Sequence, residues 1–492
     1  MSITGIRLEK FKKFKDLDID LASPITLIYG ENSSGKSSFI KAILSLIQTF
    51  SSQNKHQSWR AQGEYVDLGL YKDYINEHNI ENKFSISVRS KPNATHLRNL
   101  TKTTRRSNKS KAIVEHKITY EIDNSTNQAK VNSFQQTAKL LNTEAGEDQK
   151  FLEEESTLVK LVRPKTRSYY HLKVDPKSIK SIFHSFGEDD FVRRAMAQAN
   201  DVSRVTLEGN FDIKPLKEDE SASPYGEDRL VLNMFTRSVD ELSRLMNSFY
   251  YLGPLRMSPL RSYTLNFQGL SVGPSGAMTP LILSYLNQKA SEDRTKGKIH
   301  KNRYERFQDW FRTIFPDYDV SVDSNEDVVR LKVVSKDRVD SIMDVGFGFS
   351  QVLPIIVQTA AMEPEDVLII EQPELHLHPK AQVAFAKFLS SASKAGIRFI
   401  IETHSEHILK GLQLEVSNHE IDKNTGLNSR NIKSYYFHKS GKVSQMLLNK
   451  WGEIEGGWPE GFFDESYNIS SSIVKNKIRS LRKENEQKTV EA

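Results

Sequence analysis

The chain has 492 residues, which is enough for about three domains of ordinary size. It contains no cysteine, which excludes disulfide scaffolds, Cys-ligated zinc or iron–sulfur sites and thiol nucleophiles. The 69 Lys and Arg against 63 Asp and Glu leave a net charge of +6, so any nucleic-acid surface must be a local patch. We find neither a membrane-length apolar run nor a signal peptide, and therefore expect a cytoplasmic protein without a membrane partner.

The first 90 residues predict several strands and one glycine-rich loop. Ile3–Phe11 and Leu17–Leu21 alternate apolar and charged side chains, as half-buried strands do, and Ile25–Tyr29 has the apolar character of a buried strand. The loop GENSSGKSS follows, and Phe39–Phe50 has helical spacing. Residues 65–90 predict further strands, as in YVDLGLYKDY and KFSISV.

Between about residues 91 and 240 the chain is polar, and we interpret this stretch as an insertion, part strand and part helix, that forms a compact lobe. Beyond it, Val352–Thr359 predicts a helix, and Val367–Ile370 and Ile397–Ile401 predict two more buried strands. Strands that alternate with helices predict a mainly parallel α/β sheet. The end of the chain, from about residue 470, predicts a basic helix.

The glycine-rich loop carries the clearest chemical signal. It fits the pattern GxxxxGK[ST] in full, between a predicted strand and a predicted helix. Its glycines let backbone N–H groups surround phosphate oxygens, Lys36 can reach the β- and γ-phosphates, and the Ser37 hydroxyl can ligate Mg²⁺. An ordinary glycine turn is the alternative. The predicted ATP-binding residues of this loop are Gly30, Asn32, Ser33, Ser34, Gly35, Lys36, Ser37 and Ser38.

An apolar strand that ends in an acid predicts the second half of the site. Val367–Ile370 leads into Glu371, the position at which a Walker B acid holds Mg²⁺. About thirty residues later another apolar strand leads to His404, whose imidazole can lie near a γ-phosphate. A buried strand with a polar residue at its end is the alternative in both places. We predict Ser37 and Glu371 as metal-binding residues, and Glu371, Gln372, Glu374 and His404 as the catalytic set.

A glycine- and serine-rich turn precedes the predicted helix at Val352–Thr359. Its residues Gly348, Ser350 and Gln351 can offer backbone amides and a hydroxyl to an anion. Within one subunit we expect this turn to lie too far from the phosphate loop to complete the same site. It serves that site if two chains enclose ATP head to tail, whereas an ordinary glycine turn is the alternative.

Together these motifs resemble an ABC/SMC-like ATPase head, and more closely the OLD-like and AAA15/AAA21-type ATPases of prokaryotes. The resemblance rests on the phosphate loop, on VDLG (Val66–Gly69), YLGPLR (Tyr251–Arg256) and GFGFSQVLP (Gly346–Pro354), and on the Walker B segment IEQPELHLHP (Ile370–Pro379). The segment WPEGFFDE (Trp458–Glu465) is similar to a C-terminal domain found in a subset of these ATPases.

The resemblance implies an α/β fold with a mixed sheet, flanking helices, an N-terminal antiparallel sheet and an α+β insertion lobe. It implies that residues 1–90 and 246–445 are the two halves of the ATPase head, that 91–245 is the insertion, and that 446–492 is a tail domain with a basic helix. It also implies that Lys36 and Ser37 form the Walker A pair, that Glu371 is the Walker B acid, that Ser350 and Gln351 belong to the signature motif and that His404 is the switch histidine.

The sequence departs from the general ABC pattern at Gln372, which stands where these ATPases have their catalytic glutamate. An amide can position water but cannot accept its proton, so Glu371 and Glu374 are the candidate bases and we expect slow hydrolysis. No glutamine can be assigned to the Q-loop, for which Gln48 and Gln62 are candidates by position only.

Two further chemistries are not expected. Many OLD-like proteins carry a C-terminal nuclease that holds Mg²⁺ in an acidic cluster, and the residues after His404 show no such pattern, so we expect no intrinsic nuclease. His376 and His378 lack the further ligands of a metal site, and we interpret them as part of a subunit interface. Two basic runs, Arg89–Lys111 and Lys296–Arg306, are candidate nucleic-acid contacts, although solvated loops explain such runs more often.

Three functions are therefore open, and we expect ATP and Mg²⁺ as the ligands. The first is an ATPase that forms homodimers or higher homo-oligomers and controls a separate effector, such as a nuclease. The resemblance extends to ATPase subunits of anti-phage defence systems such as Septu and PARIS, where the chain would act as sensor or scaffold. The second is a DNA-repair or recombination ATPase, similar to RecF or Rad50, that acts directly on DNA. The third is a regulatory module that holds ATP without hydrolysing it.

Overall fold

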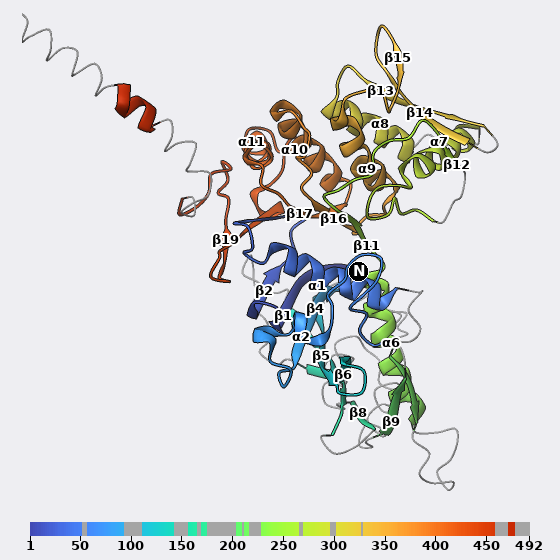
Figure 1. Ribbon diagram of the computed structural model, residues 1–492, viewed down its shortest axis with the longest axis vertical. Coiled ribbons are helices and arrows are strands. Elements are labelled where there is room, and N and C mark those ends of the chain that lie inside the picture. The colour runs from blue at the N-terminus through green and yellow to red at the C-terminus, as the bar shows by residue number, and fades with distance from the viewer. Residues whose placement is uncertain are drawn as a thin grey trace, which may run out of the picture.

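The computed structural model (Figure 1) describes most of the chain. The described ranges are 1–51, 57–92, 111–141, 156–164, 169–174, 203–208, 211–215, 228–264, 269–295, 302–325, 328–457 and 471–477. Most of the basic run Arg89–Lys111, the first part of the run Lys296–Arg306 and the whole of Trp458–Glu465 lie outside these ranges. Within them no helix has both the length and the apolar character that crossing a membrane requires.

The N-terminal strands begin a nine-stranded antiparallel sheet. Its order is β10 (Asp212–Pro215), β9 (Ser203–Glu208), β8 (Tyr170–Val174), β7 (Ser156–Val162), β6 (Gln128–Leu141), β5 (Lys111–Asp123), β4 (Phe84–Lys91), β1 (Ser2–Phe11) and β2 (Phe14–Asp20). The sheet crosses the expected boundary at residue 90, because β4 pairs with β5 from Phe84 to Ser90. The described strands of the predicted insertion thus extend the N-terminal sheet.

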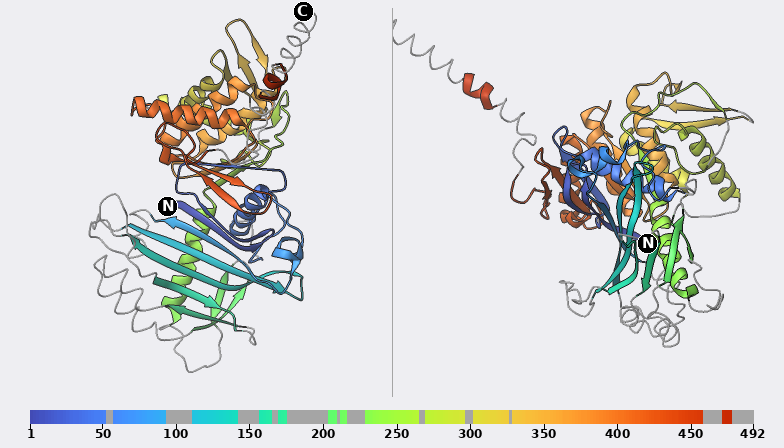
Figure 2. Two further views of the ribbon diagram at one scale, coloured as in Figure 1. Left: turned by 90° about the vertical axis from the view of Figure 1, so that its left-hand side faces the viewer. Right: turned by 60° about the horizontal axis from the view of Figure 1, so that its bottom comes forward.

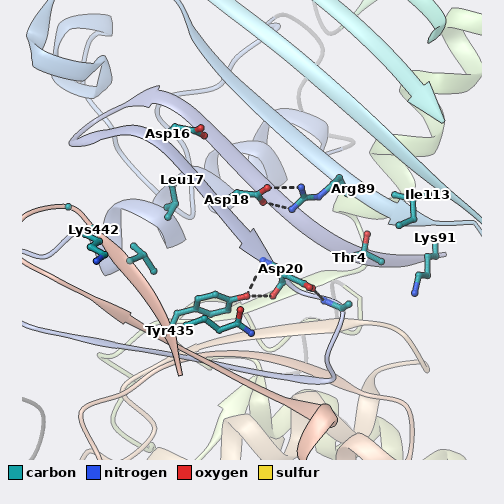
Figure 3. A pocket seen from close by; sticks show the side chains of 14 residues that line it. Thr4, Asp16, Leu17, Asp18, Asp20, Arg89, Lys91, Ile113, Tyr435 and Lys442 are labelled. Carbon is teal, nitrogen blue, oxygen red and sulfur yellow. Dashed lines mark hydrogen bonds and ion pairs between the residues drawn. The ribbon is translucent and has the colours of Figure 1, made fainter. Parts of the chain in front are cut away.

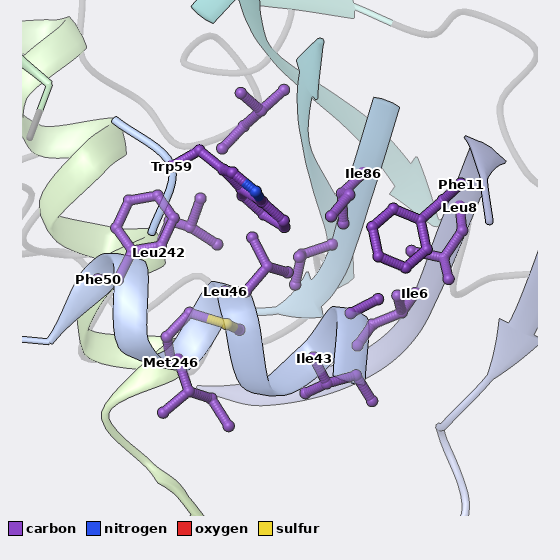
Figure 4. Close-up of a cluster of buried hydrophobic side chains, with 14 of the residues drawn as sticks. Ile6, Leu8, Phe11, Ile43, Leu46, Phe50, Trp59, Ile86, Leu242 and Met246 are labelled. Carbon is purple, nitrogen blue, oxygen red and sulfur yellow. The ribbon is translucent and has the colours of Figure 1, made fainter. Parts of the chain in front are cut away.

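Two helices cover the inner face of this sheet. Helix α1 (Lys36–Phe50) and helix α6 (Asp228–Met246) pack on each other, and the left view of Figure 2 shows α6 running behind the strands. Figure 4 shows the result: Ile6 of β1, Ile86 of β4, Leu46 of α1 and Leu242 of α6 converge in one core. The hydrophobic effect of burying these side chains holds the N-terminal half together.

A second sheet of six strands lies beside the first and carries the motifs. Its order is β11 (Phe249–Leu252), β16 (Val367–Glu371), β17 (Arg398–Glu402), β3 (Ile25–Gly30), β18 (Ile432–Phe437) and β19 (Val443–Met446). All neighbours are parallel except the hairpin β18–β19. Its strands are buried on both faces: Ile28 packs into the N-terminal core, whereas Leu27 packs into a second core on the other face.

The second core lies under helices α9 (Phe347–Ala361), α10 (Pro379–Lys394) and α11 (Glu406–Ile421). Helices α7 (Thr279–Thr295) and α8 (Arg303–Ile314) extend this layer toward a small sheet, which consists of β12 (Tyr263–Thr264), β13 (Asp319–Ser324), β14 (Val328–Val334) and β15 (Val339–Ser341). Figure 1 shows this layer and the N-terminal sheet on opposite sides of the six-stranded sheet.

Most predicted elements of the head are confirmed, including the predicted strands in β1, β2, β3, β4, β16 and β17 and the predicted helices in α1 and α9. The predicted fold class, a mixed sheet with flanking helices and an N-terminal antiparallel sheet, is confirmed as well. Residues 471–477 are helical.

The strand predicted in YVDLGLYKDY is wrong. The segment forms a turn, then the short helix α2 (Tyr71–Tyr74) and a 3₁₀ turn, η1 (Asn76–His78). Gly69 has a φ of 79°, and the Asp67 and Asp73 carboxylates accept hydrogen bonds from the backbone N–H groups of Gly69 and Leu70. These side chains compete with a strand ladder for the backbone donors. The aromatic side chains of Tyr71 and Tyr74 are nevertheless buried, which produced the apolar pattern.

We predict that Phe84→Ala strongly destabilises the N-terminal half. The ring is fully buried, with centroid distances of 5.0 Å to Tyr120 and 5.3 Å to Trp59. A cavity of this kind costs about 3–5 kcal/mol of unfolding free energy, measurable by chemical denaturation. Ile80→Ala is the control: Ile80 is 48% exposed, and its loss should cost less than about 0.5 kcal/mol. Equal losses in the two variants would contradict the packing described.

Candidate active site

The phosphate loop joins β3 to α1 and depends on two glycines. Gly30 has a φ of 143° and Gly35 a φ of 108°, conformations that other residues rarely adopt. A side chain at Gly30 would overlap the backbone oxygen of Phe437, and one at Gly35 would overlap the ring of Phe14. The loop therefore passes close to its neighbours and enters α1 with Gly35 as the N-cap.

Lys36, the first residue of α1, points back into the loop. Its Nζ donates hydrogen bonds of 2.8 Å to the carbonyl oxygens of Gly30 and Glu31, and the side chain is buried. Burial lowers the pKa of Lys36, while the carboxylates of Glu402 and Glu31 act in the opposite direction. The loop thus surrounds a cation, as a phosphate-binding loop requires.

Asn32, Ser33 and Ser37 are exposed at the mouth of the loop, and Ser38 is half-buried. The Ser34 hydroxyl is buried and has no hydrogen-bond partner in the described part of the chain. A buried hydroxyl without a partner costs free energy, so this group fits a loop that takes up a polar ligand.

Two glutamates meet beside Ser37. The strands β16 and β17 are parallel neighbours, and their register places Glu371 opposite Glu402 at the carboxyl ends. The Ser37 Oγ lies 3.5 Å from Oε1 of Glu402, to which it donates a hydrogen bond. The other oxygen of Glu402, Oε2, is buried without a partner among the described residues. Burial, reinforced by the charge of Glu371, raises the pKa of Glu402 to about 7.

This group of oxygens fits Mg²⁺. Mg²⁺ is typically held by one or two carboxylates, a hydroxyl, water and the phosphates of its substrate. Ser37, Glu371 and Glu402 supply that set, and a cation would satisfy the free oxygen of Glu402. In the described ranges no group of three or more His, Asp and Glu forms a complete metal cage, and His376 and His378 are part of none.

The segment YLGPLR supports Glu371 from the neighbouring strand. Tyr251, on β11, donates a hydrogen bond of 2.8 Å to Oε1 of Glu371. Arg256, which is only 7% exposed, donates to the backbone oxygen of Glu371 at 2.7 Å and to that of Gln372 at 3.5 Å. These contacts indicate that Arg256 orders the loop that follows β16.

The loop after β16 is strained and tied to the next strand. Gln372 has a φ of 45°, and Glu374 accepts hydrogen bonds from the Thr403 hydroxyl at 2.7 Å and from the backbone N–H of His404 at 2.8 Å. The His404 side chain is exposed at the same edge, and partial burial together with the charge of Lys36 lowers its pKa. Glu374 is therefore occupied in holding the His404 segment.

The turn predicted at Gly348, Ser350 and Gln351 is wrong, because α9 begins at Phe347 and these residues form its first turns, which lie against the loop that follows β16. A side chain at Gly348 would come within 3.1 Å of the backbone oxygen of His376. Ser350 and Gln351 are buried, and the Ser350 hydroxyl donates to Phe347 at 2.8 Å. Within the described ranges no hydrogen bond or ion pair joins Gly348, Ser350 or Gln351 to the phosphate loop.

The two Q-loop candidates have structural roles. The Gln48 amide lies inside the N-terminal half, where it donates to the backbone oxygens of Arg60 at 2.6 Å and Val66 at 3.2 Å. Gln62 forms an isolated β-bridge with Asp67. Both positions serve the packing of the segment between α1 and α2.

Sequence reasoning missed Glu402 and left Tyr251 and Arg256 without a role. Glu402 ends an apolar strand just as Glu371 does, so the same pattern could have identified it. No comparable signal exists for Tyr251, which lies 120 residues from the carboxylate that it contacts.

We predict that Arg256→Lys lowers ATP turnover mainly through kcat. Arg256 reaches the two backbone oxygens with two separate nitrogens of its rigid, planar guanidinium, and the single ammonium of a lysine would not reproduce this geometry, so the loop that carries Gln372 would be held less firmly. Loss of one such charged contact corresponds to about a tenfold lower kcat, with little change in KM.

Arg312→Lys is the matched control, because Arg312 is exposed on α8 and pairs with Asp319 at 2.6 Å. An exposed pair contributes little, so its steady-state kinetics should stay within about twofold of the native chain. Equal kcat losses in both variants would argue against a positioning role for Arg256.

Comparison with known proteins identifies a family for this sequence. The sequence matches the AAA_21 family, described as "AAA domain, putative AbiEii toxin, Type IV TA system", over residues 25–410. A search of curated proteins finds no match.

Three solved structures are distantly similar. An SMC head bound to the C-winged helix domain of ScpA has 11% identity and a TM-score of 0.43. The match covers 92% of this chain and 99% of that SMC head. The SMC head domain from Thermotoga maritima has 10% identity and a TM-score of 0.35, and the match covers 91% of this chain and 100% of that domain. An SMC head with an extended coiled coil, bound to the C-terminal domain of ScpA derived from Pyrococcus furiosus, has 11% identity, a TM-score of 0.39, and coverages of 96% and 99%.

The matched residues 25–410 make up well over half of the chain and include the phosphate loop, the turn before α9 and the ends of β16 and β17. The chain therefore belongs to the AAA_21 family of AAA-domain ATPases.

Proposed function

We propose that the chain binds ATP with Mg²⁺, hydrolyses it slowly and assembles head to tail, as a scaffold or sensor that controls a separate effector. The observation that carries the proposal is the convergence of three elements at one sheet edge. There the buried Lys36 lies in a phosphate-type loop, and Ser37 of the same loop faces two strand-end carboxylates, Glu371 and Glu402.

In this proposal Lys36 and the backbone N–H groups of Gly35 and its neighbours bind the phosphates. Ser37, Glu371 and Glu402 would hold Mg²⁺, which would supply positive charge beside the phosphates. Tyr251 and Arg256 fix the orientation of the Glu371 segment through the contacts given above.

Slow hydrolysis follows from the groups beside the phosphates. Gln372 can orient a water molecule but cannot take its proton. Glu374 already accepts hydrogen bonds from Thr403 and His404, so its geometry suits a structural link better than a free base. Glu371 is then the remaining candidate base of the predicted catalytic set, and it also serves the metal. Because one carboxylate would serve both as base and as metal ligand, we expect low turnover.

The exposed surface around the turn before α9 supports a second copy as the partner. Large apolar side chains gather in the segments that border it, with exposed fractions of 85% for Leu255, 49% for Met343 and 59% for Phe347. Exposed apolar side chains of this size are typical of interaction sites. A second chain that packs here would bring its own phosphate loop toward Ser350 and Gln351.

The basic runs give weak support to the alternative, a DNA-repair or recombination ATPase. Of their described members, Arg89 pairs with Asp18 and Arg303 pairs with Glu363, whereas Lys91 forms no such pair with the described residues. Paired side chains are less available to phosphates of nucleic acid. We therefore favour the effector-controlling function in anti-phage defence, with the effector, such as a nuclease, on another polypeptide.

Steady-state ATP turnover with and without duplex DNA tests the proposal, with Lys36→Ala as the blank. We expect Mg²⁺-dependent turnover below about 1 per second, absent in the blank and unchanged by DNA. A severalfold increase with DNA that salt suppresses would favour the DNA-acting alternative. Native turnover no greater than that of Lys36→Ala, despite ATP binding, would favour a module that holds ATP without hydrolysis.

A further inference from the structure

A hollow of about 840 Å³ lies between the N-terminal sheet and the β18–β19 hairpin (Figure 3). One wall comes from the outer face of β1, β2 and β4, and the other comes from Tyr435, Val443 and Gln445 of the hairpin. None of the residues assigned above to ATP or Mg²⁺ lines it. Its volume falls within the range of about 300–1,000 Å³ that is typical of small-molecule sites.

The carboxylates on its walls are already neutralised. Asp16, Asp18 and Asp20 lie on one face of β2 and line the hollow. Asp16 pairs with Arg7 at 2.7 Å, Asp18 pairs with Arg89, and Asp20 pairs with Lys433. Each of these three carboxylates therefore faces a cation, so together with their partners they add no net charge to the hollow.

The Arg89 pair depends on a glycine. Arg89 belongs to β4 and Asp18 to β2, and Gly5 of the intervening strand β1 lies opposite Arg89 on one side and opposite Asp20 on the other. A side chain at Gly5 would overlap the Arg89 guanidinium. The absence of a side chain lets the guanidinium lie across β1 and reach Asp18 with both terminal nitrogens, as Figure 3 shows.

Two lysines of the lining have no such partner. Lys91 and Lys442 form no ion pair or side-chain hydrogen bond with the described residues, and Figure 3 shows them at opposite sides of the hollow. The hydroxyl of Thr4, which is 8% exposed, is buried there without a hydrogen-bond partner. The lining thus carries two surplus positive charges and one unsatisfied donor, and this combination suits a ligand with two negative charges.

We propose that this hollow binds a small dianion, of which a phosphate monoester of mononucleotide size is the representative. Lys91 and Lys442 would bind its negative groups from two sides, and Thr4 would donate to it. A nucleic-acid strand fits less well, because Tyr435 is the one aromatic side chain of the lining and its hydroxyl is already bonded to the Asp20 backbone.

The hairpin wall is also connected to the phosphate loop. Strand β18 pairs with β3 up to Phe437 opposite Gly30. The Lys13 Nζ joins the two segments, since it donates to the backbone oxygens of Ser33 at 2.8 Å and Lys439 at 3.2 Å. Lys439 in turn pairs with Glu31 at 3.4 Å.

A ligand held by Lys442 would therefore act on a turn that contacts the phosphate loop directly. Any effect of the dianion on ATP affinity must be matched by an equal effect of ATP on the affinity for the dianion. This coupling rests on the proposed function, whereas binding of the dianion does not.

The test uses the full chain carrying Lys36→Ala, which disables the phosphate loop, and isothermal titration with AMP. We expect saturable binding of one AMP per chain that weakens about tenfold in Lys91→Glu and in Lys442→Glu. Lys387→Glu, which changes an exposed lysine of α10, is the control and should leave the affinity unchanged. Thermal unfolding of each variant confirms that the fold is intact.

Titrations with pyrophosphate and with succinate show whether the hollow prefers phosphate or carboxylate groups. Binding of AMP and pyrophosphate alone supports a phosphate ligand, and equal binding of succinate supports a dicarboxylate at the same site. The proposal is overturned if none of the three binds, or if Lys91→Glu and Lys442→Glu bind as the parent does. Failure of the native chain to bind ATP would contradict the proposed function while leaving the AMP result valid.

Discussion

Parallel pairing of β3, β17 and β16 is the constraint on which the whole site depends. Because parallel strands end at the same edge of a sheet, this pairing places the phosphate loop, Glu402 and Glu371 side by side. Segments far apart in the sequence thereby form one cluster of charged groups. The strands are buried on both faces, so two separate cores hold their register, and a slip of one residue would expose apolar side chains. The chemistry at the edge is therefore stabilised by packing on both sides of the sheet.

Several groups offset the free-energy cost of burying two neighbouring carboxylates at this sheet edge. Burial raises the pKa of both Glu371 and Glu402, and the charge of Glu371 raises the pKa of Glu402 further. Lys36, Tyr251 and Arg256 offset that cost through charge and hydrogen bonds. A divalent cation would reduce the repulsion between the carboxylates, which makes cation and nucleotide binding mutually favourable.

The β18–β19 hairpin reaches the same edge from the opposite side, through Lys13 and Lys439. Events in the hollow behind the hairpin can thus affect the phosphate loop without any contact to its ligand.

Local patterns predicted the parts of the site that local sequence determines. Gly30, Gly35 and Lys36 follow from a loop whose chemistry requires these residue types in this order, and Glu371 follows from a strand that ends in an acid. Glu402 has the same local pattern, but its role in the site depends on β17 lying next to β16. Local sequence does not determine which strands pair. Tyr251 and Arg256 act across more than a hundred residues, so no spacing rule reveals them. The failed strand at Tyr71–Tyr74 shows a different limit: buried aromatic side chains were mistaken for alternation, although Asp67 and Asp73 capped a turn.

Complementation between two inactive variants tests most directly whether two chains complete the ATP site. Lys36→Ala disables the phosphate loop, and Gly346→Arg obstructs the turn before α9. A side chain at Gly346 meets nothing within 4 Å, so the second variant should fold normally. We predict that each variant alone is inactive and that an equal mixture regains about a quarter of native turnover, because half of randomly formed dimers are mixed and each mixed dimer has one intact site. An inactive mixture of correctly folded variants, or full activity of Gly346→Arg alone, would contradict a site shared between chains.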